Sequence, residues 1–172
     1  MGYKVGDLVA CAGQGAGAVR EIVTRRVGGV EREFVVLPLS YVTVTMPADS
    51  SSLADLRGVV GPDGVEGVLR VLAAPDPGEP SASWGEQDLM IRLGVAPDDY
   101  DGPVSHESAK VAEVVRTLTH RQRRAGLAFE ERGLLFLARN NLASHIAAYL
   151  GLTVERAERL IDDALAGTPT EK

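Results

Sequence analysis

The sequence predicts an α+β protein in which a small N-terminal β-barrel is followed by an all-α helical domain. Before residue 50, short runs rich in β-branched and aromatic residues alternate with glycine turns. After residue 62, apolar residues recur every three or four positions, as they do on one face of a helix. The 172 residues are 45% hydrophobic and 24% charged, which is the composition of a globular protein with a buried core.

The barrel is expected to contain four or five short strands. The glycines at 13, 15 and 17 supply a turn after the first strand, Gly28-Gly29 is a hairpin signal, and Pro47 ends the last run. Several short strands within about 45 residues are typical of an SH3-like or Tudor-like barrel. The expected strands cover residues 7–11, 18–25, 32–39 and 41–46.

The helical part is delimited by capping residues. Ser105 and Thr153 are expected to be N-caps, and Gly126, Gly151 and Gly167 to end helices. The helices themselves are expected around 65–72, 84–93, 111–118, 134–150 and 154–165.

These elements divide the chain into four parts. We expect a barrel domain over 1–50, a linker over 51–62, a helical domain over 63–167 and a frayed tail over 168–172.

The net charge of −6 is concentrated in the middle of the chain. Residues 61–102 hold two Lys or Arg against nine Asp or Glu. A protein that depends on phosphate contacts should instead carry a basic stripe. The one basic cluster is Arg121-Gln-Arg123-Arg124, for which a solvated helix end and a phosphate contact are both open interpretations.

No catalytic, metal or cofactor site is predicted. His106, His120 and His145 lack metal-ligand spacing and are expected to be solvated or capping residues, while Cys11 is expected to be a small core thiol. The glycine-rich run at 13–17 has neither the Gly-x-Gly-x-x-Gly spacing of a dinucleotide-binding turn nor the Gly-Lys-Ser/Thr of a Walker loop. We therefore expect a protein that is not an enzyme.

Location and oligomeric state are also expectations. No apolar run approaches the roughly 18 residues of a membrane span, and the first residues do not read as a secretory signal. We expect a cytoplasmic monomer that binds no cofactor.

Several segments, taken in order, resemble the CarD/CdnL family of bacterial RNA-polymerase-binding transcription regulators. Residues 4–9 with the following glycines, and 42–47, are similar to its barrel strands. Trp84 falls at the family's tryptophan, and 110–118 is close to the family signature. Gly126-Leu127 and Glu131-Arg132 are similar to its next helix start.

The resemblance implies two binding surfaces. The Tudor-like domain would bind the lobe of the RNA polymerase β subunit, and the helical domain would meet promoter DNA, where Trp84 would wedge into the minor groove and hold the open complex. The polymerase-binding candidates are Arg25, Val42, Thr43, Val44, Thr45 and Met46, and the DNA-binding candidates are Trp84, Arg132, Arg121, Arg123 and Arg124.

The chain departs from the family at several of these positions. Thr45 stands where the family usually has an arginine, and residues 85–89 replace a basic run with acidic or neutral residues. Ala128 replaces a serine that would cap the long helix. These changes predict weakened DNA contact. An alternative is an interaction adaptor whose barrel binds a partner other than the polymerase, through a free strand edge.

Overall fold

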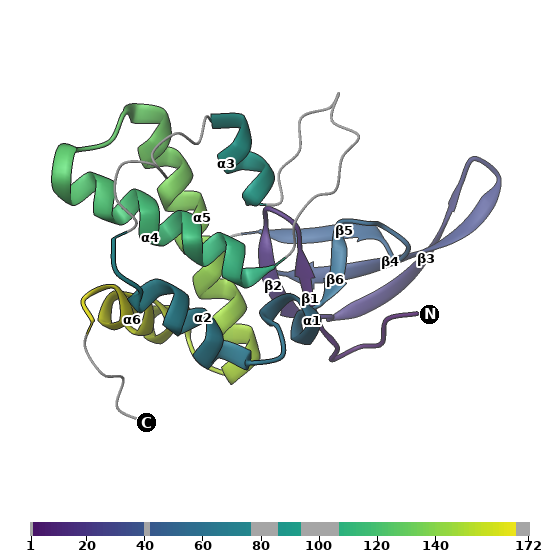
Figure 1. Cartoon of the computed structure of the whole chain (residues 1–172). Helices are drawn as coiled ribbons and strands as arrows, with labels where there is room; N and C mark the ends of the chain where they lie inside the picture. The colour runs from purple at the N-terminus through teal and green to yellow at the C-terminus, as the bar shows by residue number, and fades with distance from the viewer. Residues whose placement is uncertain (1, 40–41, 77–85, 94–106, 168–172) are drawn as a thin grey trace.

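A computed structural model of the chain describes residues 2–39, 42–76, 86–93 and 107–167. In this part, six strands precede six helices, which confirms the α+β class with β structure first (Figure 1). The strands are β1 (Leu8–Cys11), β2 (Gly15–Ala18), β3 (Glu21–Val27), β4 (Val30–Pro38), β5 (Thr43–Pro47) and β6 (Leu53–Asp55). The helices are α1 (Leu56–Val60), α2 (Gly64–Ala73), α3 (Glu86–Arg92), α4 (Ser108–Ala125), α5 (Phe129–Leu150) and α6 (Val154–Leu165).

The strands form two three-stranded antiparallel sheets, ordered β2-β1-β6 and β3-β4-β5. The chain passes from one sheet to the other at Val19 and Arg20. The Val19 N–H donates to the Asp7 carbonyl at 2.9 Å, and the Arg20 N–H donates to the Val36 carbonyl at 3.0 Å. The single strand expected over 18–25 is therefore wrong, because these residues belong to two strands in different sheets.

A small apolar core lies between the two sheets. It is built from Val9, Cys11, Val19, Val35, Leu37 and Leu53. The side chains of β1 alternate, so that Val9 and Cys11 enter this core while Ala10 joins the larger core of the helical part. The β1 strand is thus covered on both faces, by the small core on one and by the helical core on the other.

The glycine-rich segment after β1 differs from the expected turn, since Gly15 and Gly17 lie within β2. Their lack of a side chain is required by close packing. A Cβ atom on Gly17 would lie 2.6 Å from the Pro38 carbonyl oxygen, and one on Gly15 would lie 2.7 Å from the Ser144 hydroxyl oxygen. The glycines therefore let β2 approach its neighbours closely.

The segment 51–62, expected to be a linker, contains β6 and α1. Leu53 of β6 pairs with Cys11 of β1, and Leu56 is fully buried in the helical core. Asp55 caps α1 by accepting a hydrogen bond from the Arg57 N–H at 2.8 Å. Apolar side chains that complete both cores give this segment its structure.

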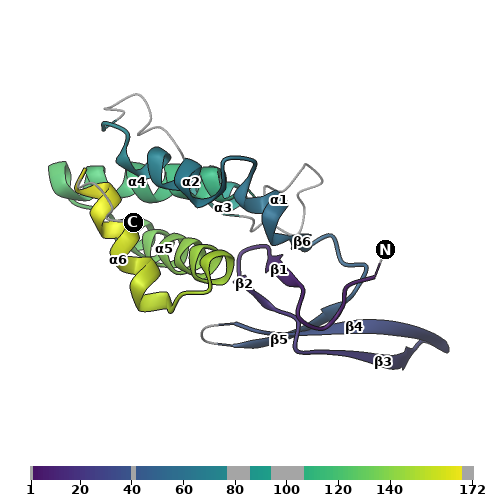
Figure 2. The same ribbon diagram turned by 90° about the horizontal axis from the view of Figure 1, so that it is seen from below.

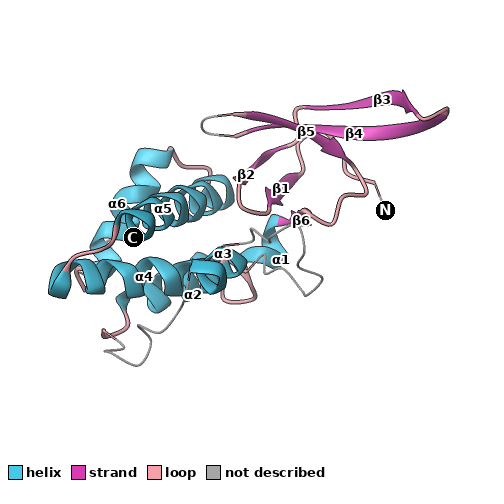
Figure 3. Ribbon diagram, turned by 90° about the horizontal axis from the view of Figure 1, so that it is seen from above, coloured by secondary structure: helices cyan, strands magenta, loops and turns pink. Residues whose placement is uncertain are grey.

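The helices stack in layers beside the sheets. Figures 2 and 3 show α1, α2, α3 and α4 along one side and the long α5 along the other. Their shared core includes Leu72, Val115, Leu118, Leu142 and Ile161. In the described part of the chain, no helix combines the length and apolarity needed to cross a membrane.

The helix ends follow most of the predicted signals. Gly126 and Gly151 follow α4 and α5 with positive φ, and the Thr153 hydroxyl caps α6 by accepting from the Arg156 N–H at 3.3 Å. Helix α4 begins at Ser108 rather than directly after Ser105, which lies outside the described residues.

Strands β3 and β4 form a hairpin that extends past the other strands, away from the helices (Figure 1). Gly28 and Gly29 make its turn, with φ of 59° and 82°, which confirms the predicted hairpin signal.

Candidate functional site

The β3–β4–β5 sheet has one inner and one outer face, which its register identifies. Ile22, Val35 and Met46 lie in one row, and all three contact the small core. Because successive residues of a strand point to opposite faces, the next row, with Val23 and Phe34, points outward. Arg25 and Arg32, directly opposite each other, belong to this outer face.

The two outer-face arginines have different partners. Like charges placed directly opposite in a sheet repel. Arg32 is bound by Asp49, whose two carboxylate oxygens lie 3.1 and 3.2 Å from its terminal nitrogen. The Arg25 guanidinium instead lies 5.6 Å from the centre of the Phe34 ring, within the range of a cation–π contact. Arg25 is therefore an exposed cation supported by an aromatic ring.

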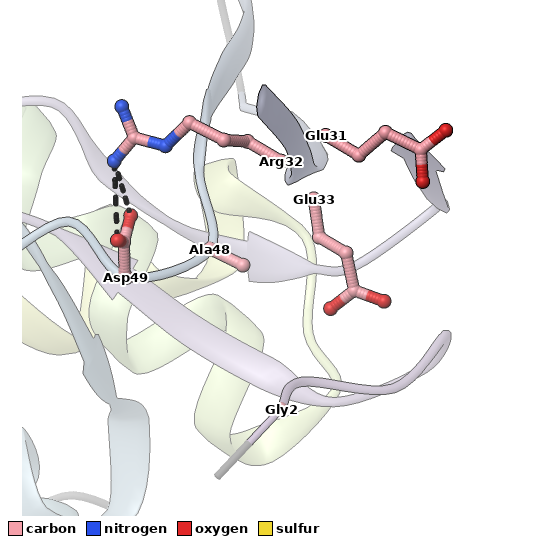
Figure 4. A pocket seen from close by; sticks show the side chains of 6 residues that line it. All are labelled: Gly2, Glu31, Arg32, Glu33, Ala48 and Asp49. Carbon is pink, nitrogen blue, oxygen red and sulfur yellow. Dashed lines mark hydrogen bonds and ion pairs between the residues drawn. The ribbon is translucent and has the colours of Figure 1, made fainter. Parts of the chain in front are cut away.

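A surface cavity of about 370 Å³ lies beside Arg32 (Figure 4). Figure 4 shows Arg32 reaching Asp49, while Glu31 and Glu33 point away from that pair. Nowhere in the described residues do three His, Cys, Asp or Glu side chains gather in a way that could hold a metal ion. The cavity is an open acidic hollow at the edge of the sheet.

The predicted polymerase-binding residues 42–46, which lie in β5 and directly before it, do not all have the same exposure. Val42, Thr43 and Thr45 are exposed, whereas Val44 and Met46 pack against the small core. The Cys11 thiol lies 3.4 Å from the Met46 sulfur. The first three side chains are thus open to a partner, and the last two hold the strand in place.

Cys11 is the buried thiol that the sequence predicted. Burial raises the pKa of the Cys11 thiol above its usual value, which keeps the group protonated and unreactive near neutral pH.

The predicted DNA-binding arginines do not form one basic patch. Arg121 is ion-paired with Glu131, and the two side chains are 15% and 25% exposed. Arg124 is ion-paired with Asp76 at 2.7 Å. The side chains of Arg123 and Arg132 are exposed on α4 and α5. Trp84 lies outside the described residues.

Helix α5 also presents two aromatic side chains that sequence analysis missed. Phe129 and Phe136 are 79% and 68% exposed. They are seven residues apart, so they share a helix face, away from the buried Leu135 and Leu142. The Arg132 guanidinium lies 6.0 Å from the centre of the Phe129 ring. The sequence could have indicated their exposure, because both phenylalanines lie off the apolar stripe of the helix.

One buried histidine contradicts the expectation of solvated or capping histidines. His145 is 3% exposed, and its Nδ1 lies 2.9 Å from the hydroxyl oxygen of the buried Ser108. This pair joins α5 to the start of α4. His106 lies outside the described residues.

Comparison with protein-family models gives two matches, which lie in order along the chain. Residues 3–60 match the CarD-like/TRCF RID domain, and residues 105–162 match the CarD C-terminal domain. The first match takes in both sheets and α1, and the second takes in α4, α5 and most of α6.

Proposed function

Because the chain belongs to the CarD family of RNA-polymerase-interacting transcription proteins, we propose that it binds the lobe of the polymerase β subunit through the outer face of β3–β4–β5. We further propose that binding there modulates the stability of the promoter open complex. The family assignment supports interaction with the polymerase, and the exposed groups of the sheet support this particular face.

The observation that carries the proposal is the placement of Arg25. Its guanidinium is exposed on the outer face and rests on the half-buried Phe34 ring, and the exposed Thr45 belongs to the same face of the sheet, farther from the hairpin turn. An arginine held by an aromatic ring loses less conformational entropy on binding than a free one. Arginine is also enriched among the residues that dominate protein interfaces.

DNA contact is proposed to be weak and to occur within the polymerase complex. Arg121 and Arg124 are engaged by carboxylates within the protein, which reduces their contribution to phosphate binding. Arg123 and Arg132 are exposed, and Phe129 beside Arg132 adds an aromatic surface for a base. Trp84 keeps its proposed role as a wedge.

The proposed mechanism uses binding energy and no chemical step. A protein that contacts polymerase and DNA together changes the closed–open equilibrium by the difference in its affinity for the two states. Greater affinity for the open complex lengthens the lifetime of that complex.

The test compares Arg25→Glu with Arg26→Glu, which makes the same charge change at the adjacent residue of β3. Arg26 belongs to the opposite face, and its Nε donates to the Gly29 carbonyl at 3.4 Å. Binding to core polymerase, or to the isolated β lobe, is measured by calorimetry at moderate salt. We expect Arg25→Glu to weaken binding by about tenfold or more, because the new carboxylate would face a like charge or lie unpaired in the interface. Arg26→Glu should have little effect.

Equal losses in the two variants would contradict the proposed face. If the unaltered protein binds the polymerase but not the β lobe, the lobe assignment fails. If it binds neither, the alternative of an adaptor for another partner gains support.

A further inference from the structure

Strand β2 lies between α5 and the β3–β4–β5 sheet, and it contains no side chain larger than a methyl group. Its four residues are Gly-Ala-Gly-Ala. It contacts α5 on one side and β4 on the other (Figure 2). A strand of this composition brings the backbone of the sheet close to the long helix.

On the helix side, one hydroxyl group joins β2 to α5. The Ala16 N–H donates to the Ser144 hydroxyl oxygen at 2.6 Å, and the same hydroxyl donates to the Ala16 carbonyl at 2.9 Å. Ser144 is 4% exposed. The Ser144 hydroxyl therefore forms hydrogen bonds with both the N–H and the carbonyl of Ala16, which point away from β1. A neighbouring strand would bind the same two groups.

On the sheet side, backbone meets backbone. A Cβ atom on Gly17 would lie 2.6 Å from the Pro38 carbonyl oxygen at the end of β4. The path from α5 through β2 to β4 thus consists of a short hydroxyl group and main-chain atoms. Such a path has few rotatable bonds, and Ala10 and Ala16 further bury the junction in the helical core.

We propose that Ser144 is a positioning residue that locks β2 onto α5, so that the sheet carrying Arg25 and the helices carrying Arg132 move as one body. The functional part of this inference rests on the proposed function. The position at which the sheet binds the polymerase then determines the position at which the helices contact DNA.

The test measures the distance between the two parts in the free protein. Spin labels are placed on exposed positions of β3 and α6, at Thr24 and Arg159, in a Cys11→Ala background, and pulsed electron spin resonance gives the distance distribution. Ser144→Ala is compared with Thr153→Ala, which also removes a hydrogen-bonding hydroxyl but lies at the start of α6.

We expect a narrow distribution in the background protein and in Thr153→Ala. Ser144→Ala leaves two buried backbone groups without a partner, which should shift the docked-to-undocked ratio by about tenfold and broaden the distribution. An unchanged distribution in Ser144→Ala, or equal broadening in Thr153→Ala, would overturn the inference.

Gly17→Ala tests the same path from the other side and covers the case in which Ser144→Ala fails to fold. Its methyl group must displace the Pro38 carbonyl, so the mean distance should shift; an unshifted mean would count against the path.

The functional readout is open-complex lifetime in the presence of saturating protein. Ser144→Ala should keep its polymerase affinity and lose most of its effect on lifetime. A broadened distribution with an unchanged effect on lifetime would refute the positioning role. Failure of the unaltered protein to bind polymerase would refute the proposed function alone, because the distance measurement does not use polymerase.

Discussion

Replacing Arg121 with alanine separates a structural role from a DNA-binding role for the basic end of α4. Arg121 lies at a position where phosphate contact was one interpretation of the sequence. In the structure its guanidinium pairs with Glu131, which joins α4 to the first turn of α5. We therefore expect Arg121→Ala to lower stability and to leave DNA affinity nearly unchanged.

The size of the loss follows from the burial of the pair. Hydrogen bonds to charged groups contribute about 1.5–3 kcal/mol, and solvent screening reduces this for side chains that stay 15% and 25% exposed. Glu131 also keeps a second partner, since the Ala128 N–H donates to its carboxylate at 3.0 Å. The lower part of the range, about 1.5–2 kcal/mol, is therefore expected. For a chain of this size that lowers Tm by roughly 3–8 °C.

The assay combines thermal unfolding with DNA binding by the polymerase complex at several salt concentrations. A double-mutant cycle with Glu131→Ala isolates the pair energy. Arg123→Ala is the matched control, because its side chain is exposed on the same helix turn. It should change the free energy of unfolding by less than about 0.5 kcal/mol. It should also make the dependence of log DNA affinity on log salt concentration less steep by about one unit. The reasoning fails if Arg121→Ala has the Tm of the unaltered protein and shows this same reduction in salt dependence.

Two further outcomes are expected. Burial raises the pKa of the Cys11 thiol above the usual 9.0, so the folded state holds this proton more tightly than the unfolded state does. The stability that this thiol contributes is complete below about pH 9 and is lost as pH rises through its folded pKa. Urea midpoints should therefore fall in that range, and they should fall less in Cys11→Ala. Tyr3, whose pKa is also raised by burial, contributes to the pH dependence that remains. Ala128→Ser should stabilise the protein by about 1 kcal/mol, because it completes a capping box with Glu131 at the start of α5; an unchanged denaturant midpoint would show that the box does not form.

The sequence was sufficient for the parts of the fold governed by local signals. The Gly28-Gly29 turn, the helical spacing in α2 and the glycine at the end of α5 are each read from a few neighbouring residues. The strand break at Val19 could not be predicted, because it depends on hydrogen bonds to Asp7 and Val36 in two different sheets. Local alternation continues across this break.

The candidate site was predicted unevenly for a similar reason. The face of the sheet to which Arg25 and Thr45 belong follows from strand alternation. The pairing of Arg121 with Glu131 depends on how α4 packs on α5, and a cluster of arginines in sequence gives no indication of it. Ser144 and Ala16 are 128 residues apart, and no local pattern connects them.

The reach of the β3–β4 hairpin can change during evolution without disturbing either core. Between Phe34 and the hairpin turn, both strands are exposed on both faces. A Cβ atom on Gly28 or Gly29 would meet nothing within 4 Å. Inserting two residues into each strand would lengthen the hairpin by about 7 Å and keep every side chain on its original face. Related proteins could thus reach binding surfaces that lie at different distances by changing the length of this one hairpin. The junction between sheet and helices would stay the same.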